Sequence, residues 1–189
     1  MSGKAKYRYR MMQAIQPTEN FQIYTSSTAS TTNAWVTGLN GSTGVNGTAW
    51  PIADNVIALI VWPRLSAIQD PTGAVISGSY LYDARVPLTA AMTTFPLQYA
   101  QAPPMVQVTM VLIDEASAQR LDTNSSTEPA VISSALDVSG TASHEKLFTD
   151  VTQYTSDLQI LTGSLSAAHI NYQVLSSVVN LRESKWSAQ

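Results

Sequence analysis

The most constraining feature of this sequence is the uncharged run Val56–Trp62, within ADNVIALIVWPRLS, in a chain otherwise rich in serine, threonine and glutamine. The run is too short to cross a membrane as a helix, which takes about 20 apolar residues. Its β-branched residues, and its limits at Asp54-Asn55 and Pro63, are typical of a buried strand. An exposed run of this kind would promote aggregation. The sequence therefore predicts a central strand covered on both faces.

Composition favours one globular domain over residues 1–189, because 189 residues with 44% hydrophobic content are enough for an ordinary core. Charged residues make up only 12% of the chain, the formal net charge is −3, and the basic residues lie mostly near the two ends. This balance argues against a nucleic-acid surface. The chain has no cysteine, which excludes disulfides, thiolate zinc sites and a cysteine nucleophile.

A second strand is predicted over Met105–Ile113, where apolar and polar residues alternate. The alternation places Gln107 and Thr109 on one face and four apolar residues on the other, namely Val106, Val108, Met110 and Leu112. Asp114 is expected to cap a short helix, EASAQRL. A final strand is predicted over Ile170–Leu181, with a bulge near Ser176-Ser177 where the alternation loses phase.

Two further helices are predicted. One spans Lys6–Ile15 and ends at Gln16-Pro17, since the residue before a proline avoids the α region. The other runs from Ser143 to about Ser166, where an apolar stripe recurs at helical spacing: Leu147, Val151, Tyr154, Leu158, Leu161 and Leu165. Short strands are predicted at Phe21–Tyr24 and Ser79–Leu88, and loops at Thr25–Ala49 and, with a turn at Asp70–Gly73, Ser66–Ser79. This order indicates an α+β fold with a mainly antiparallel sheet.

The sequence indicates no enzyme and requires no cofactor. GxSxG, P-loop, HExxH and GxGxxG patterns are absent, and nothing places a nucleophile or metal beside His144 or His169. A hydrolase with paired carboxylates is an unfavoured alternative. Its candidate acids are better explained as caps and turn residues: Asp54, Asp83, Asp114, Glu115 and Asp150.

Calcium is a weak candidate ligand for one polar stretch. Oxygen-bearing side chains alternate at Asp122, Asn124, Ser126 and Glu128, as at the start of a calcium loop. The stretch lacks the glycine of the sharp turn and the later bidentate glutamate, so a solvated loop is favoured. A second alternative function is an extracellular carbohydrate- or protein-binding module, with a tryptophan as stacking platform: Trp35, Trp50, Trp62 or Trp186.

Five segments together carry a resemblance to a known family. They are YRYRMMQAIQPTENFQIY (Tyr7–Tyr24), ADNVIALIVWPRLS (Ala53–Ser66), LYDAR (Leu81–Arg85), PPMVQVTMVLIDEASAQRL (Pro103–Leu121) and INYQVLSSVVNLRESKWS (Ile170–Ser187). In this order they resemble the type IV pilin-like minor pseudopilins of the Verru_Chthon cassettes of Verrucomicrobia, most closely the protein C family. More distantly, the layout is similar to the J-type minor pseudopilins of type II secretion and the W-type minor pilins.

The resemblance implies a non-enzymatic structural subunit of a pilus-like or pseudopilus-like assembly. It implies a cleaved prepilin leader, an apolar N-terminal helix in the inner membrane, and an α+β head in the periplasm or at the cell surface. Lys6–Ile15 is then expected as the tail of that helix, packed on the sheet. We expect contacts to other pilin-like subunits through Tyr7, Tyr9 and Met11, and through exposed parts of the Thr25–Ala49 loop. Leader and apolar helix are not in this sequence, which we interpret as a truncated soluble head.

Overall fold

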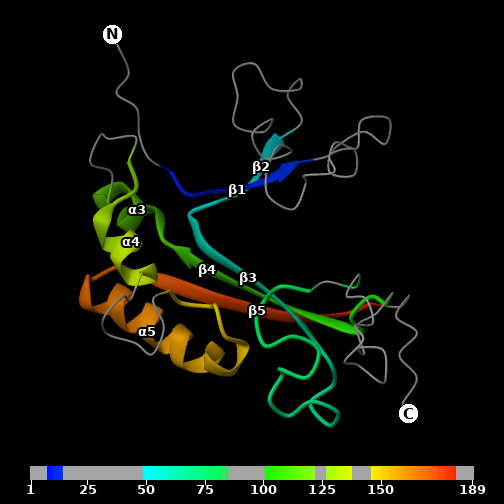
Figure 1. Ribbon diagram of the computed structural model, residues 1–189. Helices are drawn as coiled ribbons and strands as arrows, with labels where there is room; N and C mark the ends of the chain where they lie inside the picture. The colour runs from blue at the N-terminus through cyan, green and yellow to red at the C-terminus, as the bar shows by residue number, and fades with distance from the viewer. Residues whose placement is uncertain are drawn as a thin grey trace, which may run out of the picture. The chain divides into compact units, whose positions relative to one another are not determined.

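The computed structural model describes residues 8–14, 49–82, 84, 101–121, 127–137 and 146–181 (Figure 1). These residues fall into two compact units, one within Arg8–Asn55 and the other within Val56–Gln189. Helices and antiparallel sheets occur together, so the α+β prediction is confirmed. Within the described ranges, no helix is long and apolar enough to cross a membrane.

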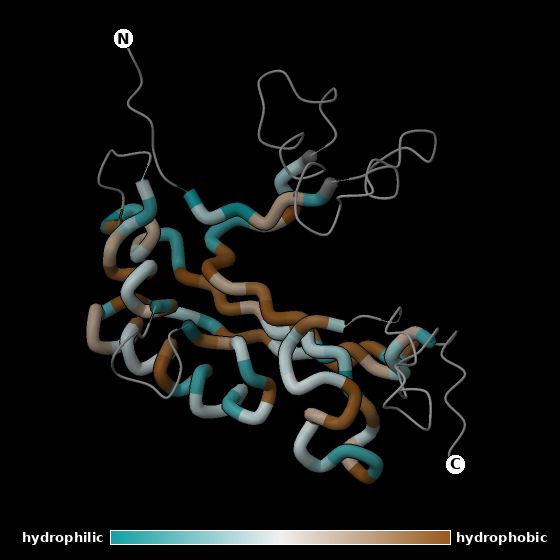
Figure 2. Tube along the Cα trace, viewed as in Figure 1, coloured by the Kyte–Doolittle hydropathy of each residue, from teal (hydrophilic) through white to brown (hydrophobic). Residues whose placement is uncertain are grey.

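The larger unit is built around a three-stranded antiparallel sheet in the order β3-β4-β5. Its strands are β3 (Val56–Arg64), β4 (Met105–Ile113) and β5 (Tyr172–Asn180), and its helical segments are α3 (Glu115–Leu121), α4 (Ala130–Leu136), the 3₁₀ turn η2 (Val151–Gln153) and α5 (Tyr154–Ala167). Figure 2 shows that β3 and β4 are largely hydrophobic along their length. The most apolar segments of the sequence therefore form adjacent strands.

The strand predicted over Val56–Trp62 exists, but it is not central and it is not covered on both faces. β3 lies at one edge of the sheet, and Leu59 and Val61 are 49% and 44% exposed. Pro63 does not end the strand, which continues to Arg64. Proline is tolerated there because an edge strand does not need every backbone N–H for pairing.

One face of this sheet is covered by α5; we call it the covered face. On β3 and β4 it carries Ile60, Trp62, Thr109, Val111 and Ile113, all of which are buried. Leu161 and Leu165 of α5 are fully buried, and the Tyr154 hydroxyl is 2.7 Å from the Thr109 hydroxyl oxygen. In Figure 1, α5 runs alongside the sheet. The core therefore lies between α5 and the covered face.

The opposite face is apolar and half-exposed; we call it the open face. Strand pairing places Leu59 beside Met110, Met110 beside Leu175, and Val61 beside Val108. The apolar residues of the open face are Leu59, Val61, Val106, Val108, Met110, Leu112, Leu175 and Val179, and β5 adds the polar residues Gln173 and Ser177. Leu175 and Val179 on β5 are 41% and 48% exposed. The four apolar residues predicted to share one face of Met105–Ile113 do so, and that face is the open one.

The smaller unit contains a two-stranded antiparallel pairing, and it corrects the prediction of an N-terminal helix over Lys6–Ile15. β1 (Arg10–Ala14) pairs with β2 (Ala49–Asp54), with a register shift between Met11 and Met12. Arg10 Nε lies 3.1 Å from Asp54 Oδ1. A helix of about ten residues is marginal in water, whereas the paired strand satisfies its backbone groups through β2.

Two of the observed helices, α5 and α4, differ from the prediction. The predicted helix from Ser143 to Ser166 begins later, at Tyr154, because Phe148 adopts a left-handed φ of 58°. The buried Asp157 carboxylate accepts the Phe148 N–H at 2.7 Å, and the Asp150 carboxylate caps η2 through the Thr152 N–H. The sequence also did not predict α4, which begins after Pro129.

The remaining predictions have mixed outcomes. The helix capped by Asp114 and the loop Ser66–Ser79 with its turn at Asp70–Gly73 are confirmed. The bulge predicted in the last strand is wrong, because β5 pairs with β4 in one continuous register. The described part of Ser79–Leu88 contains no strand. The strand predicted at Phe21–Tyr24 lies outside the described residues, as does the loop Thr25–Ala49 apart from Ala49, where β2 begins.

Candidate functional site

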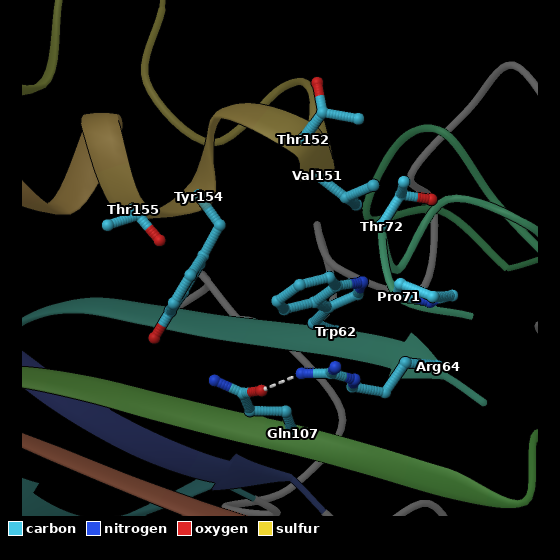
Figure 3. A pocket seen from close by; sticks show the side chains of 9 residues that line it. All are labelled: Trp62, Arg64, Pro71, Thr72, Gln107, Val151, Thr152, Tyr154 and Thr155. Atoms are coloured by element: carbon cyan, nitrogen blue, oxygen red, sulfur yellow. Dashed lines mark hydrogen bonds between the residues drawn. The ribbon is translucent and has the colours of Figure 1, made fainter. Parts of the chain in front are cut away.

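A hollow of about 480 Å³ opens beside the covered face, between the sheet, the loop after β3 and the start of α5 (Figure 3). Its lining combines two aromatic rings, one guanidinium group, one amide and several hydroxyl groups. The lining residues are Trp62, Arg64, Pro71, Thr72, Gln107, Val151, Thr152, Tyr154 and Thr155. Such a lining can hold a small polar group through hydrogen bonds.

Trp62 forms the floor of this hollow and is only 6% exposed. Its Nε1–H donates to the Gly73 carbonyl oxygen at 3.2 Å, and its ring centroid lies 5.2 Å from that of Tyr154. The Arg64 Cζ lies 4.5 Å from the Trp62 ring centroid, within the range of a cation–π contact. Because Trp62 is buried by these contacts, it is not an exposed stacking platform for a sugar.

Arg64 is held in place by two neighbours. Besides its contact with Trp62, its Nη1 donates to Gln107 Oε1 at 2.7 Å, as the dashed line in Figure 3 shows. In the part of the chain that the structure describes, no carboxylate forms an ion pair with Arg64. The guanidinium therefore keeps further N–H donors for an oxygen-bearing group that enters the hollow.

The loop wall of the hollow is fixed by Asp70 and Gly73. The Asp70 side chain is fully buried and accepts hydrogen bonds from the backbone N–H groups of Gly73, Ala74 and Val75, at 2.6 to 3.2 Å. Gly73 has a φ of +75°, and a Cβ placed there would lie 2.1 Å from Trp62 Cζ2. Only glycine combines that conformation with so close an approach to the tryptophan ring.

A second, smaller hollow of about 290 Å³ lies along β3 and is lined mainly by apolar side chains, including Leu136 and Phe148. Tyr80 also lines it, and its hydroxyl has no hydrogen-bond partner among the described residues. Burial, reinforced by the Asp157 carboxylate, raises the pKa of the Tyr80 hydroxyl well above its usual value. Tyr80 is therefore neutral at physiological pH and unsuited to act as a base.

Of the acids considered for hydrolysis, the structure describes Asp54, Asp114, Glu115 and Asp150, and none of these four lines a hollow found in the described part of the chain. Asp54 pairs with Arg10, and Asp150 caps η2. Asp114 caps α3, accepting the Ser117 N–H at 2.7 Å and the Asn171 side-chain amide at 3.0 Å. These hydrogen bonds lower the pKa of Asp114. Glu115 follows Asp114 in the first turn of α3, and Asp83 lies outside the described residues.

The weak calcium candidate is not tested as a whole. Asp122, Asn124 and Ser126 lie outside the described residues, and Glu128 is exposed just before α4. Within the described ranges, no three histidine or acidic side chains converge to hold a metal ion. His169 is exposed at the end of α5 with a φ of 55°, and His144 is not described.

The predicted partner-binding residues are only partly placed. Tyr7 lies outside the described residues. Tyr9 precedes β1, where its carbonyl oxygen accepts the Asn55 N–H at 2.6 Å, and Met11 lies in β1 opposite Ala53. Both are half-buried and belong to the strand pairing, not to a helix surface. Trp50 in β2 is 49% exposed, whereas Trp35 and Trp186 are not described.

Sequence reasoning missed the open face as a candidate interaction surface. The signal was present in Met105–Ile113, where Val106, Val108, Met110 and Leu112 share one face. The alternation predicts that these residues share a face, but nothing in the local pattern indicates which face a helix covers. Large, half-exposed apolar surfaces mark sites of interaction in soluble domains.

Comparisons with known protein families, with curated proteins and with solved structures found no match to this chain.

Proposed function

We propose that this chain is the head of a non-enzymatic structural subunit of a type IV pilus-like or type II pseudopilus-like assembly. The proposal starts from the five segments that resemble the Verru_Chthon protein C family. In such a protein a leader and an apolar helix precede the head, which lies in the periplasm or at the cell surface and contacts other pilin-like subunits. The work of such a subunit is assembly, and it needs complementary surfaces, not reactive groups.

The observation that carries the proposal is the open face of the β3-β4-β5 sheet. Four of its residues, Leu59, Val61, Leu175 and Val179, are between 41% and 49% exposed. An antiparallel sheet ordinarily presents a polar face to water, so an apolar second face favours a further packing partner. The apolar helix that the resemblance implies is a suitable partner, because a helix with an apolar stripe packs on such a face.

The N-terminal part of the chain departs from the layout that the resemblance implies. Arg10–Ala14, within the segment expected as the tail of the long helix, form β1, so a helix that covers the open face would have to lie earlier in the full-length protein. The hollow beside Trp62 does not favour a carbohydrate-binding function in the same way, since its tryptophan ring is buried.

Single-cysteine labelling tests the proposal, because the chain has no cysteine of its own. We expect Val61→Cys to react readily with a water-soluble maleimide in the 189-residue chain and to be protected in the full-length membrane form. Thr155→Cys, at an exposed position of α5 near the hollow, is the matched control and should react equally in both forms. Equal labelling of Val61→Cys in the two forms would contradict the proposed covering of the open face.

A further inference from the structure

Among the residues that the structure describes, the outer edge of β5 is a regular, uncharged strand edge with no pairing strand. β5 pairs with β4 at every position from Tyr172 to Asn180, and no described strand pairs with its other side. Eight of its nine residues are exposed. The strand contains no charged residue, no proline and no bulge, although natural edge strands usually carry one of these to prevent association. β5 therefore lacks the common protection against pairing with another strand.

The direction of the backbone groups follows from two hydrogen bonds at the ends of β5. The Leu181 N–H donates to the Pro104 carbonyl at 2.9 Å, and the Asn171 carbonyl accepts the Asp114 N–H at 3.1 Å. Both bonds are directed towards the β4 side and both involve odd-numbered positions. Because a strand repeats every two residues, the backbone groups of the even-numbered residues face the outer edge. These residues are Tyr172, Val174, Ser176, Val178 and Asn180.

From this edge we propose that β5 pairs in antiparallel orientation with β5 of a second copy of the chain. In the register of full overlap, Ser176 lies opposite Ser176 of the second copy, since Ser176 is the central residue of the strand. Each residue whose backbone groups face the outer edge then lies opposite a residue of the same kind in the second copy. Each such pair exchanges two backbone hydrogen bonds. The result is one continuous sheet across a two-fold axis.

The side chains of β5 are complementary to themselves in this register. Val174 meets Val178 of the second copy, a pairing of β-branched residues that favours sheets. On the other face Leu175 meets Ser177, so that a large side chain lies beside a small one. No like charges meet, because β5 carries none. These features favour a second copy over a partner with a charged strand, and they do not rest on the proposed function.

Disulfide formation tests the pairing in the full 189-residue chain. Residues opposite one another in a hydrogen-bonded antiparallel pair have Cα atoms about 5.5 Å apart, within disulfide range. Ser176→Cys should therefore form a covalent dimer under mild oxidation. Ser177→Cys is the matched control, because its two copies would lie offset along the strands by about 7 Å. Ser156→Cys on α5 measures the rate of random collision.

A second variant keeps the test independent of cysteine chemistry. Val178 is 51% exposed, so Val178→Lys should leave the monomer folded by circular dichroism. It places a charge at the outer edge, and we expect the dimer dissociation constant from sedimentation equilibrium to rise roughly tenfold or more. Disulfide yield for Ser176→Cys at the collision level of Ser156→Cys would overturn the proposal. Faster disulfide formation at Ser177→Cys, or an unmodified chain that stays monomeric, would also overturn it.

Discussion

Gly73 shows most clearly how a single residue fixes the loop beside the hollow. Its left-handed conformation and its contact with Trp62 leave no room for a side chain. The Trp62 ring in turn contacts Tyr154 at the start of α5 and Arg64 at the end of β3. The sheet, the loop and the helix therefore meet at one tryptophan, and a change at Gly73 acts on all three.

We predict that Gly73→Ala lowers the free energy of unfolding by about 2–4 kcal/mol, because it adds both a steric clash and backbone strain. Urea denaturation followed by tryptophan fluorescence measures the change. Gly163→Ala is the matched control, since a Cβ at Gly163 in α5 meets nothing within 4 Å. It should leave stability unchanged or raise it by up to about 1 kcal/mol. Equal effects of the two substitutions would show that the Gly73–Trp62 contact is misplaced.

Asp114 gives a prediction about pH. Hydrogen bonds from Ser117 and Asn171 lower its pKa in the folded protein below the ordinary value of 3.8. Its contribution to stability is therefore complete above that value and is lost as the pH falls through the folded pKa. We expect thermal unfolding of Asp114→Asn to depend less on pH below 3.8 than that of the unmodified chain. Identical acid dependence of the two proteins would contradict this assignment.

At the scale of elements, the strands and helices with strong local signals were predictable. Met105–Ile113 alternates throughout, and Asp114 stands directly before a good helix former, so β4 and α3 appear as predicted. The N-terminal strand was not predictable, because its partner β2 lies some 40 residues along the chain and local propensity does not reveal it. The start of α5 likewise depends on a side chain, Asp157, that binds the backbone nine residues earlier.

The two faces of the sheet were the least predictable part of the candidate site. Both faces of β4 carry β-branched residues, so its sequence does not reveal which one α5 covers. The outcome depends on distant contacts, above all the Tyr154 hydroxyl at Thr109. The hollow beside Trp62 also needs three segments to converge, and none of them carries a recognisable motif.

Adjacent residues of β3 test the assignment of faces. Ile60 is 6% exposed on the covered face, whereas Leu59 is 49% exposed on the open face. Ile60→Ala should lower the free energy of unfolding by about 2–4 kcal/mol, and Leu59→Ala by about 1 kcal/mol or less. Chemical denaturation of the 189-residue chain measures both. A larger loss of unfolding free energy for Leu59→Ala than for Ile60→Ala would show that the covered and open faces are assigned the wrong way round.

At the scale of the whole molecule, two surfaces of the larger unit are suited to binding another segment or chain. The open face suits an apolar helix, and the outer edge of β5 suits a second strand. They differ in chemistry, since the first offers side chains and the second offers backbone hydrogen bonds. A structural subunit that acts through protein contacts can use both surfaces. A hydrolase would need a convergent pair of acids, and the described hollows contain none.

The mature N-terminus of the full-length protein tests the proposed function most directly. We predict that the gene, expressed with a prepilin peptidase, yields a membrane protein whose leader is cleaved after a glycine and whose new N-terminus is methylated. Intact-mass and N-terminal peptide spectrometry, with a peptidase-free strain as control, measure both changes. A secretory signal cleaved after small residues, with no apolar helix retained, would contradict the assignment to a pilin-like assembly.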